Sequence, residues 1–329
     1  MSHLLEVENL EVKFGLRQGD LTAINGISFH LDKGERLGLV GESGAGKSVT
    51  GFAVINLISK PGFISGGRVI FNGRDLAALS QDEMRDIRGN HISMIFQDPM
   101  MTLNPVLTIG TQMVETLLAH RSLTRADAEA IALEKLKSVQ ISSPGRRLGQ
   151  YPHEFSGGMR QRIVIAIALL TDPEIIIADE PTTALDVTIQ AEIMDLLQQL
   201  CESADTGLIL ITHDLGVVSQ VTEKIAVMYA GKIVESGPTE RIVATPRHPY
   251  TQGLIKALPG NIRPGSRLNQ IPGMMPTLTD IPPGCPFNPR CHLSDTICLE
   301  QEPPLVAIDK NGCMTACHMV QPDFDDKTP

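Results

Sequence analysis

Residues 41–48 read GESGAGKS and match the phosphate-binding pattern G-x-x-x-x-G-K-S without a gap. Period-2 patterning before this segment gives way to helical patterning after it, which predicts a strand, a glycine loop and a helix. Backbone amides and the helix N-terminus would then supply positive potential to phosphates. Lys47 is expected to reach the β- and γ-phosphates, and Ser48 to ligate Mg²⁺. The nucleotide-binding residues predicted here are Gly41, Ser43, Gly44, Ala45, Gly46, Lys47, Ser48 and Val49.

Two acids close the run EIIIADE at residues 174–180. Four apolar residues ahead of them are typical of a buried parallel strand that ends at an active edge. Asp179 is suited to hold Mg²⁺, and Glu180 is placed to orient and polarise an attacking water. Two acids at a strand end are common on protein surfaces, but a phosphate loop in the same chain makes nucleotide hydrolysis the stronger interpretation.

The elements around these residues predict an α/β fold. Residues 26–40 read as β-rich, and LILIT at 208–212 reads as another buried strand. Residues 107–140 look helical and polar enough to form a separate lobe, while residues 187–203 carry an apolar stripe typical of an amphipathic helix. From residue 240 onward the composition shifts to Pro, Gly and Cys, which marks a domain boundary.

Five ordered motifs in this chain resemble those of the ABC ATPase family over residues 4 to about 240. They are the phosphate loop, MIFQDP with Gln97, the signature FSGGMRQR, ADEPTTALD, and the switch ITHDL. The resemblance implies a P-loop ABC-type ATPase core with a mixed sheet and a helical subdomain at about 98–170. The predicted domains are this core at 1–240 and a small Pro/Cys-rich C-terminal extension at 241–329.

The same resemblance assigns roles around the phosphates. Ser156, Gly157 and Gly158 would bind the γ-phosphate of ATP held by an opposite subunit, so hydrolysis would need a dimer. The signature here begins with Phe155 and has Met159 where LSGGQ is more usual, which leaves the triplet intact. Taken alone, Ser-Gly-Gly at a helix start is usually just a cap.

Four further residues take roles from the resemblance. Gln97 would contact Mg²⁺ or water, and His213 would sense the γ-phosphate and support the water held by Glu180. Asp186 would cross the dimer interface. Phe14 would stack on the base, with a plain core role as the alternative because Tyr is more usual there.

Two later stretches narrow the resemblance. RHPYTQGL at 247–254 and GCPFNPRC at 284–291 look like the C-terminal extension of oligopeptide, dipeptide and nickel importer ATPases. A peptide importer implies two transmembrane permeases, an extracytoplasmic substrate-binding protein and a second, non-identical ATPase, with this chain peripheral on the cytoplasmic face of the plasma membrane. Import of nickel, opines or another solute is the alternative. His248 and Tyr250 are expected to pack the extension on the core.

Five of the six cysteines lie after residue 284. Their spacing matches neither common zinc modules nor the standard ferredoxin run, so zinc, an iron–sulfur cluster and unligated thiols all remain open from spacing alone. The resemblance implies a [4Fe–4S] cluster, and Cys313 is an alternative fourth ligand. The predicted ligands are Cys285, Cys291, Cys298 and Cys317.

Composition argues against two other classes of function. A net charge of −10 without a Lys/Arg block gives no footprint for nucleic acid. The longest wholly apolar run, Ile163 to Leu170, is too short to span a membrane, and the N-terminus lacks the features of a signal peptide. An ABC ATPase of DNA repair would usually add coiled coils or a basic surface, and one acting on ribosomes would carry two cores, whereas this chain has one.

Overall fold

The computed structural model describes most of the chain, namely residues 3–17, 19–183, 185–258 and 270–322. The chain folds into two compact units. The first comprises Met1–Leu31, Arg36–Ala77 and Ile211–Pro329, and the second comprises Asp32–Glu35 and Ala78–Leu210. Among the described residues, no helix is both long enough and apolar enough to cross a membrane.

The first unit contains an antiparallel sheet with the strand order β2-β1-β4-β5. The strands are β1 (Leu5–Leu16), β2 (Gly19–Leu31), β4 (Gly62–Phe71) and β5 (Arg74–Asp75). Buried apolar residues recur along β1 and β2, because one face of the sheet packs on the core while the other meets solvent.

The first unit also holds a mixed set of strands in the order β11-β12-β10-β9-β3. In it β3 (Arg36–Val40) pairs in parallel with β9 (Lys224–Tyr229), and β9 pairs antiparallel with β10 (Lys232–Pro238). The C-terminal extension continues this sheet with β11 (Val306–Ala307) and β12 (Met314–Thr315). The extension is therefore joined to the core by backbone hydrogen bonds. The helices of this unit are α1 (Lys47–Val54), α9 (Leu215–Val221), α10 (Thr239–Ala244), α11 (Pro249–Lys256) and α12 (Thr296–Glu300).

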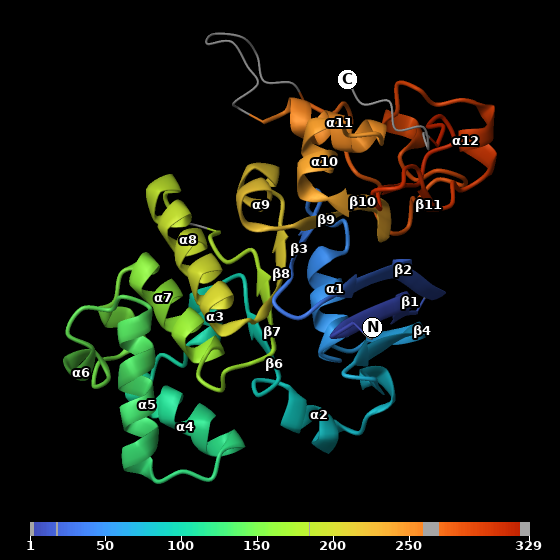
Figure 1. The fold of residues 1–329 in the computed structure, drawn as a ribbon. Helices are drawn as coiled ribbons and strands as arrows, with labels where there is room; N and C mark the ends of the chain where they lie inside the picture. Colours follow the sequence, from blue (N-terminus) through green and yellow to red (C-terminus); the bar gives the residue numbers. More distant parts are fainter. Residues whose placement is uncertain (1–2, 18, 184, 259–269, 323–329) are drawn as a thin grey trace. The chain divides into compact units, whose positions relative to one another are not determined.

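The second unit is built on β6 (Ile92–Ile95) and β7 (Ile175–Asp179), which pair in parallel. Every residue of β7 is buried, as its run of isoleucines predicts. Next along the chain, β8 (Gly207–Thr212) begins in this unit and ends in the other. The helices, drawn mostly in green in Figure 1, are α2 (Gln81–Ile87), α3 (Pro99–Thr102), α4 (Ile109–His120), α5 (Arg125–Ser138), α6 (Pro144–Arg147), α7 (Gly157–Ala168) and α8 (Val187–Ala204).

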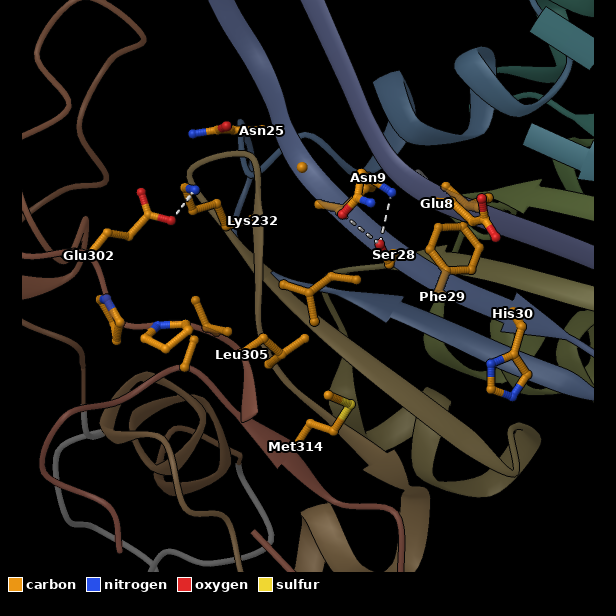
Figure 2. Close-up of a pocket in the computed structure, with 18 of the residues that line it drawn as sticks. Glu8, Asn9, Asn25, Ser28, Phe29, His30, Lys232, Glu302, Leu305 and Met314 are labelled. Carbon is orange, nitrogen blue, oxygen red and sulfur yellow. Dashed lines mark hydrogen bonds and ion pairs between the residues drawn. The ribbon is translucent and has the colours of Figure 1, made fainter. Parts of the chain in front are cut away.

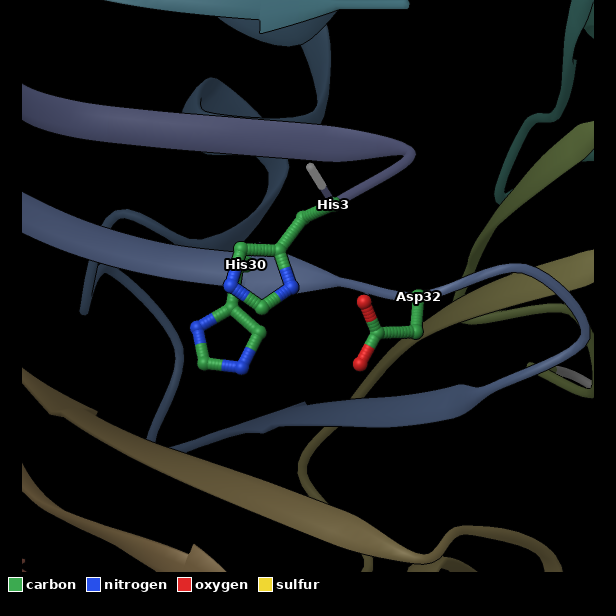
Figure 3. A group of neighbouring side chains, drawn as sticks. All are labelled: His3, His30 and Asp32. Carbon is green, nitrogen blue, oxygen red and sulfur yellow. The ribbon is translucent and has the colours of Figure 1, made fainter. Parts of the chain in front are cut away.

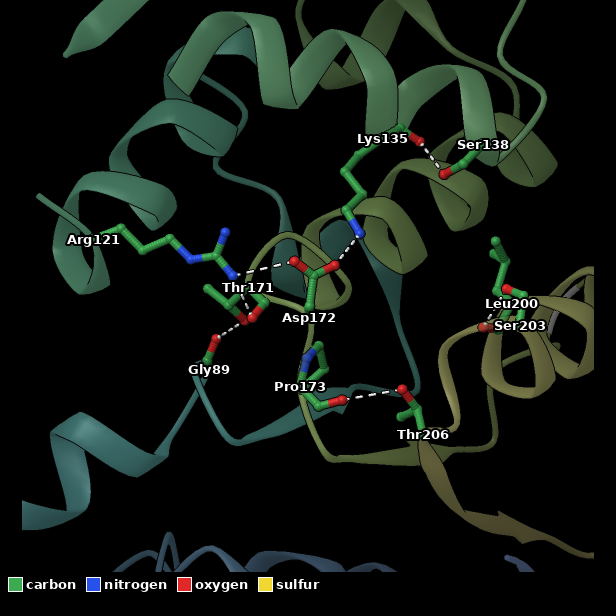
Figure 4. Close-up of polar contacts among 10 residues, drawn as sticks. All are labelled: Gly89, Arg121, Lys135, Ser138, Thr171, Asp172, Pro173, Leu200, Ser203 and Thr206. Carbon is green, nitrogen blue, oxygen red and sulfur yellow. Dashed lines mark hydrogen bonds and ion pairs between the residues drawn. The ribbon is translucent and has the colours of Figure 1, made fainter. Parts of the chain in front are cut away.

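A single carboxylate ties the helical part of the second unit to the start of β7 (Figure 4). Lys135 Nζ in α5 lies 2.6 Å from Asp172 Oδ1, and Arg121 Nη2 at the end of α4 lies 3.2 Å from Asp172 Oδ2. Arg121 Nη2 also donates to the Thr171 carbonyl at 2.7 Å. Burial alone would raise the pKa of Asp172, but the hydrogen bonds and charges of Lys135 and Arg121 together lower it. The ionised carboxylate thus holds two helices at one point.

We expect Asp172→Asn to lower stability by about 1 kcal/mol, because a networked but largely exposed ion pair is worth little more. The corresponding fall in melting temperature is about 2–4 °C. Since the folded-state pKa is lowered, this contribution is present above the unfolded pKa and is lost as the pH falls through the folded pKa. The difference between variant and wild type should therefore be constant near neutral pH and vanish in acid. Thermal unfolding across pH measures this, with Asp195→Asn, an exposed aspartate of α8, as the control. A difference that persists in acid would contradict the charge argument.

Candidate active site

The phosphate loop joins β3 to α1 in the first unit, as the sequence predicts. α1 begins at Lys47, and its N-cap Gly46 has a φ of 101°, in the left-handed region that favours glycine. A Cβ added at Gly46 would lie 2.6 Å from Ile24 Cδ1 and 3.2 Å from the Ala23 carbonyl oxygen. The glycine is required here both for its backbone angle and for the close approach of β2.

Lys47 lies inside this loop. Its side chain is buried, and Nζ donates to the backbone oxygens of Gly41 at 2.8 Å and Glu42 at 3.0 Å. The ammonium is thus held by the backbone of the loop itself, and an ammonium is a strong donor to phosphate oxygens. Ser48 is half-buried on the first turn of α1.

Two other predicted residues of the first unit lie at strand positions. Phe14 is half-buried on β1 opposite Gly62 of β4, where an added Cβ would lie 2.8 Å from the Phe14 ring. The ring therefore covers the backbone of β4 with one side, and base stacking by its exposed part stays a prediction. His213 directly follows β8 and is exposed.

In the second unit the structure brings Glu180 and Gln97 together. Asp179 is only 3% exposed at the end of β7, and Glu180 follows with a φ of 44°. Gln97 Nε2 donates to Glu180 Oε2 at 2.9 Å, and Thr183 Oγ1 donates to the same oxygen at 3.0 Å. Sequence reasoning missed Thr183, although its place three residues after Glu180 in ADEPTTALD could have suggested it. The two donors fix the carboxylate of Glu180.

The signature triplet opens α7 in the same unit. Ser156 accepts from the Met159 N–H at 3.4 Å, so the N-cap predicted from the sequence is confirmed. A Cβ added at Gly158 would lie 2.9 Å from Ile189 Cγ2 of α8, so the small residue lets the two helices approach. Asp186 caps α8 by accepting from the Ile189 N–H at 3.0 Å. The roles of Ser156, Gly157, Gly158 and Asp186 toward a second subunit stay predictions.

The segment RHPY is fixed in the first unit by a buried acid. Glu235 of β10 accepts from the backbone N–H of Arg247 at 2.6 Å and of His248 at 3.1 Å. His248 Nδ1 accepts from the Tyr250 N–H at 3.1 Å and so caps α11. Burial lowers the pKa of His248 to about 4, against a hydrogen bond to the Ala316 backbone, so the ring is neutral at physiological pH. His248 thus packs the extension on the core, as the sequence suggests.

Four cysteines of the extension share one neighbourhood. The pKa of Cys285 is raised to about 11, first by burial and then by the negative charge that Cys298, Cys317 and Cys291 carry when ionised. The pKa of Cys317 is likewise raised, first by burial and then by the charges of Cys291 and Cys298. Within the described part of the chain, no three of these sulfurs lie within 4.8 Å of one another.

Cys313 and Cys201 lie in different surroundings. After burial, the neighbours that shift the pKa of the Cys313 thiol are Asp309, Arg241 and Glu235 rather than the four cysteines. Cys201 is buried in α8 of the second unit. Cys317 therefore fits the group of four better than Cys313 does.

A pocket of about 560 Å³ lies between the antiparallel sheet, β10 and the extension (Figure 2). Asn9 and Ser28 line one side, where the Asn9 N–H donates to Ser28 Oγ at 2.8 Å. Lys232 and Glu302 form an ion pair at the other side. None of its lining residues belongs to the phosphate loop, so this pocket is not the nucleotide site.

His3, two residues before β1, stacks on His30 of β2, with ring centroids 3.9 Å apart (Figure 3). Lys224 Nζ lies 3.1 Å from His30 Nε2, and an ammonium can only donate. That nitrogen therefore accepts a hydrogen bond from a positive charge, and we assign no metal to His3 and His30.

Comparisons with known proteins agree with this geometry. Residues 24–183 match the family of ABC transporters, and residues 234–298 match the C-terminal region of oligopeptide/dipeptide transporters. The chain is 50% identical to the oligopeptide transport ATP-binding protein OppD of Bacillus subtilis, over 94% of this chain and 87% of that protein. It is 48% identical to OppD of Salmonella typhimurium, over 95% and 93% of the two chains.

The fold also matches solved structures. A dimeric bacterial ABC transporter cassette superposes with a TM-score of 0.64 at 28% identity, over 71% of this chain and 98% of the cassette. A dimeric cassette with ADP and phosphate, in a post-hydrolysis state, superposes equally well. With a phosphate loop, a buried strand ending in two acids, a capped signature helix and the matched C-terminal region, the chain belongs to the ABC transporter ATP-binding subunits of the oligopeptide/dipeptide group.

Proposed function

We propose that this chain hydrolyses ATP to drive the import of di- or oligopeptides, as one ATPase of a heteromeric pair. The observation that carries the proposal is the similarity to oligopeptide and dipeptide transport proteins, which extends through both the ATPase core and the C-terminal region. The same relatives favour peptides over nickel or opines. Its partners would be two permeases, a substrate-binding protein and a second ATPase, at the cytoplasmic face of the plasma membrane.

Each site residue has a part in the proposed reaction. Lys47 would neutralise the β- and γ-phosphates, and Ser48, Gln97 and Asp179 would hold Mg²⁺. Glu180 orients the attacking water, and the hydrogen bonds from Gln97 and Thr183 keep its carboxylate in one rotamer. His213 supports the γ-phosphate, and the partner ATPase completes the site with a triplet equivalent to Ser156, Gly157 and Gly158.

The proposal is tested by reconstituting the chain with its permeases and partner ATPase in vesicles. The isolated chain should hydrolyse ATP weakly, because its signature triplet completes a site on another chain. Hydrolysis should rise in the complex, and rise again with a peptide-loaded binding protein. Full activity of a monomer would contradict the dimeric site. Stimulation by a nickel chelate but not by peptides would contradict the substrate.

We also propose that Cys285, Cys291, Cys298 and Cys317 ligate a [4Fe–4S] cluster with a structural role. Four thiolates are what such a cluster requires. Four such thiols are at hand, because Cys285 and Cys317 each lie close enough to Cys291 and Cys298 for the charge of those thiolates to raise their pKa values. When bound, the cluster would supply a covalent staple to a segment with few apolar residues.

Protein purified without oxygen should be brown and carry about four iron atoms per chain. Cys317→Ser should lose the iron, because its sulfur belongs to the group of four. Cys313→Ser should keep it and is the matched control, four residues away on the same segment. Iron and zinc analysis with absorbance spectra makes the measurement. Colourless protein with stoichiometric zinc would overturn the cluster, and iron loss in Cys313→Ser alone would overturn the ligand set.

A further inference from the structure

The C-terminal extension contacts the phosphate loop directly through Glu42, the second residue of the loop. Arg290 Nη1 lies 2.7 Å from Glu42 Oε2, and Arg290 Nη2 lies 2.9 Å from Glu42 Oε1. The two parallel contacts make a bidentate ion pair between residues 248 positions apart in the sequence. The Arg290 side chain is only 5% exposed. Burial and bidentate geometry separate this pair from the screened pairs of the surface.

A second contact holds the backbone of the same residue. The Glu42 N–H donates to the Tyr250 hydroxyl at 2.8 Å, and Tyr250 is fully buried. The Tyr250 ring packs against Tyr229 and Phe287, with centroids 4.8 and 5.4 Å away. The Arg290 guanidinium lies 5.9 Å from the Phe287 centroid. This aromatic cluster therefore positions both the Tyr250 hydroxyl and the Arg290 guanidinium, the two groups that contact Glu42.

The contacts continue into the phosphate site. Lys47 Nζ donates to the Glu42 carbonyl, so both backbone polar groups of Glu42 are engaged, one by the extension and the other by the phosphate-binding lysine. The Glu42 carboxylate would also place a negative charge in a loop that binds a polyanion. Arg290 neutralises that charge. The ion pair therefore fixes the conformation of the loop and makes its electrostatic potential less negative.

The cysteine segment sets the position of Arg290. Arg290 ends a short helical turn, Asn288–Arg290, that lies between Cys285 and Cys291. The Asn288 N–H donates to the Cys285 carbonyl, and Asn288 Nδ2 donates to the Cys298 carbonyl at 3.3 Å. Arg290 Nε donates to the Pro272 carbonyl at 2.9 Å. These contacts orient the guanidinium independently of its ion pair with Glu42.

We propose that Arg290 is a positioning residue for ATP binding, through which the cysteine-bearing extension fixes Glu42 and hence the phosphate loop. The proposal rests on ATP binding at this loop, which is part of the proposed function, but not on the transported substrate. It gives the extension a role in nucleotide affinity in addition to packing.

The test is a double-mutant cycle between Arg290 and Glu42 in the assembled transporter. Arg290→Gln should raise the KM and Kd for Mg-ATP by about tenfold, with kcat within about twofold, since one charge-assisted bidentate contact is lost. Glu42→Gln should have a smaller effect, because it removes the repulsive charge together with the contact. In the Glu42→Gln background, Arg290→Gln should cost little more. Arg241→Gln, which breaks another ion pair of the extension at Asp309, should leave the KM unchanged.

Tyr250→Phe provides a second variant that keeps the aromatic ring and removes only the acceptor for the Glu42 N–H. It should raise the KM for ATP by several-fold while iron and zinc contents stay at wild-type levels. Equal effects of Arg290→Gln in both Glu42 backgrounds would mean that Arg290 only stabilises the extension, and would overturn the proposal. Unchanged ATP affinity in Arg290→Gln would overturn it as well. If the double-mutant cycle gives the expected result but peptides are not transported, only the proposed peptide substrate would be contradicted.

Discussion

Glu180→Gln should lower the kcat for ATP hydrolysis by about 100-fold or more and leave Mg-ATP binding near wild type, because a positioned general base contributes about 10²–10⁴-fold. Glutamine has the shape of glutamate, and its carbonyl oxygen can still accept from Gln97 or Thr183. What it cannot do is polarise a water with a full negative charge. The substitution lies outside the phosphate loop, so ATP binding should persist while hydrolysis is lost. The variant should therefore accumulate as a closed, ATP-bound dimer.

Single-turnover hydrolysis and ATP binding, both measured on the assembled complex, separate these effects. Glu174→Gln is the matched control, since Glu174 immediately precedes the same strand β7 and pairs with His91 at 2.9 Å. It removes the same charge at the opposite end of the strand and should leave kcat nearly unchanged. Near-normal turnover in Glu180→Gln would remove Glu180 from its role.

Local patterns were enough to predict the elements that carry the site. The isoleucine run of β7, the glycine loop before α1 and the capping serine of α7 are all encoded within a few residues of where they act. Their physical causes are equally local: burial on both faces of a strand, backbone angles that favour glycine, and an N-terminal amide that needs an acceptor. The same holds for the mixed α/β class of the fold.

The contacts that sequence reasoning missed are of another kind. The pairing of Arg290 with Glu42 joins distant segments, and neither residue has a pattern that distinguishes it from a solvated charge. Asp172 likewise looks like an ordinary loop acid until α4 and α5 bring Arg121 and Lys135 to it. Such contacts depend on how elements pack, which hydrophobic periodicity does not specify.

The choice between Cys313 and Cys317 in the extension likewise depends on packing that the sequence does not specify. Spacing left Cys313 and Cys317 as alternative partners of the other three cysteines. The short strand β12 (Met314–Thr315) lies between the two and pairs with β10. Cys313 then lies near Asp309 and Glu235, whereas Cys317 lies near Cys291 and Cys298. Strand pairing, rather than cysteine spacing, separates the two candidates.

Lys47→Ala should weaken Mg-ATP binding itself by about 10- to 100-fold, because an ammonium contacting phosphate oxygens contributes about 1.5–3 kcal/mol. The lysine is already placed for this contact, since its side chain is only 5% exposed and its Nζ is held by the carbonyls of Gly41 and Glu42. Removing the lysine also removes its hydrogen bond to the Glu42 carbonyl, so the loop loses both a positive charge and an internal hydrogen bond. Lys33→Ala, at an exposed lysine in the turn after β2, removes the same charge outside the loop and should leave affinity unchanged.

Equilibrium binding of Mg-ATP, with Mg-ADP alongside, makes the measurement for Lys47→Ala. ATP should lose more affinity than ADP, because the γ-phosphate contact is present only with ATP. This is the opposite of Glu180→Gln, where binding persists and only turnover is lost. Equal affinities of Lys47→Ala and wild type for ATP would contradict the assignment of the phosphate site. An equal loss for both nucleotides would restrict the lysine to the β-phosphate and leave the γ-phosphate to His213 and the partner's signature residues.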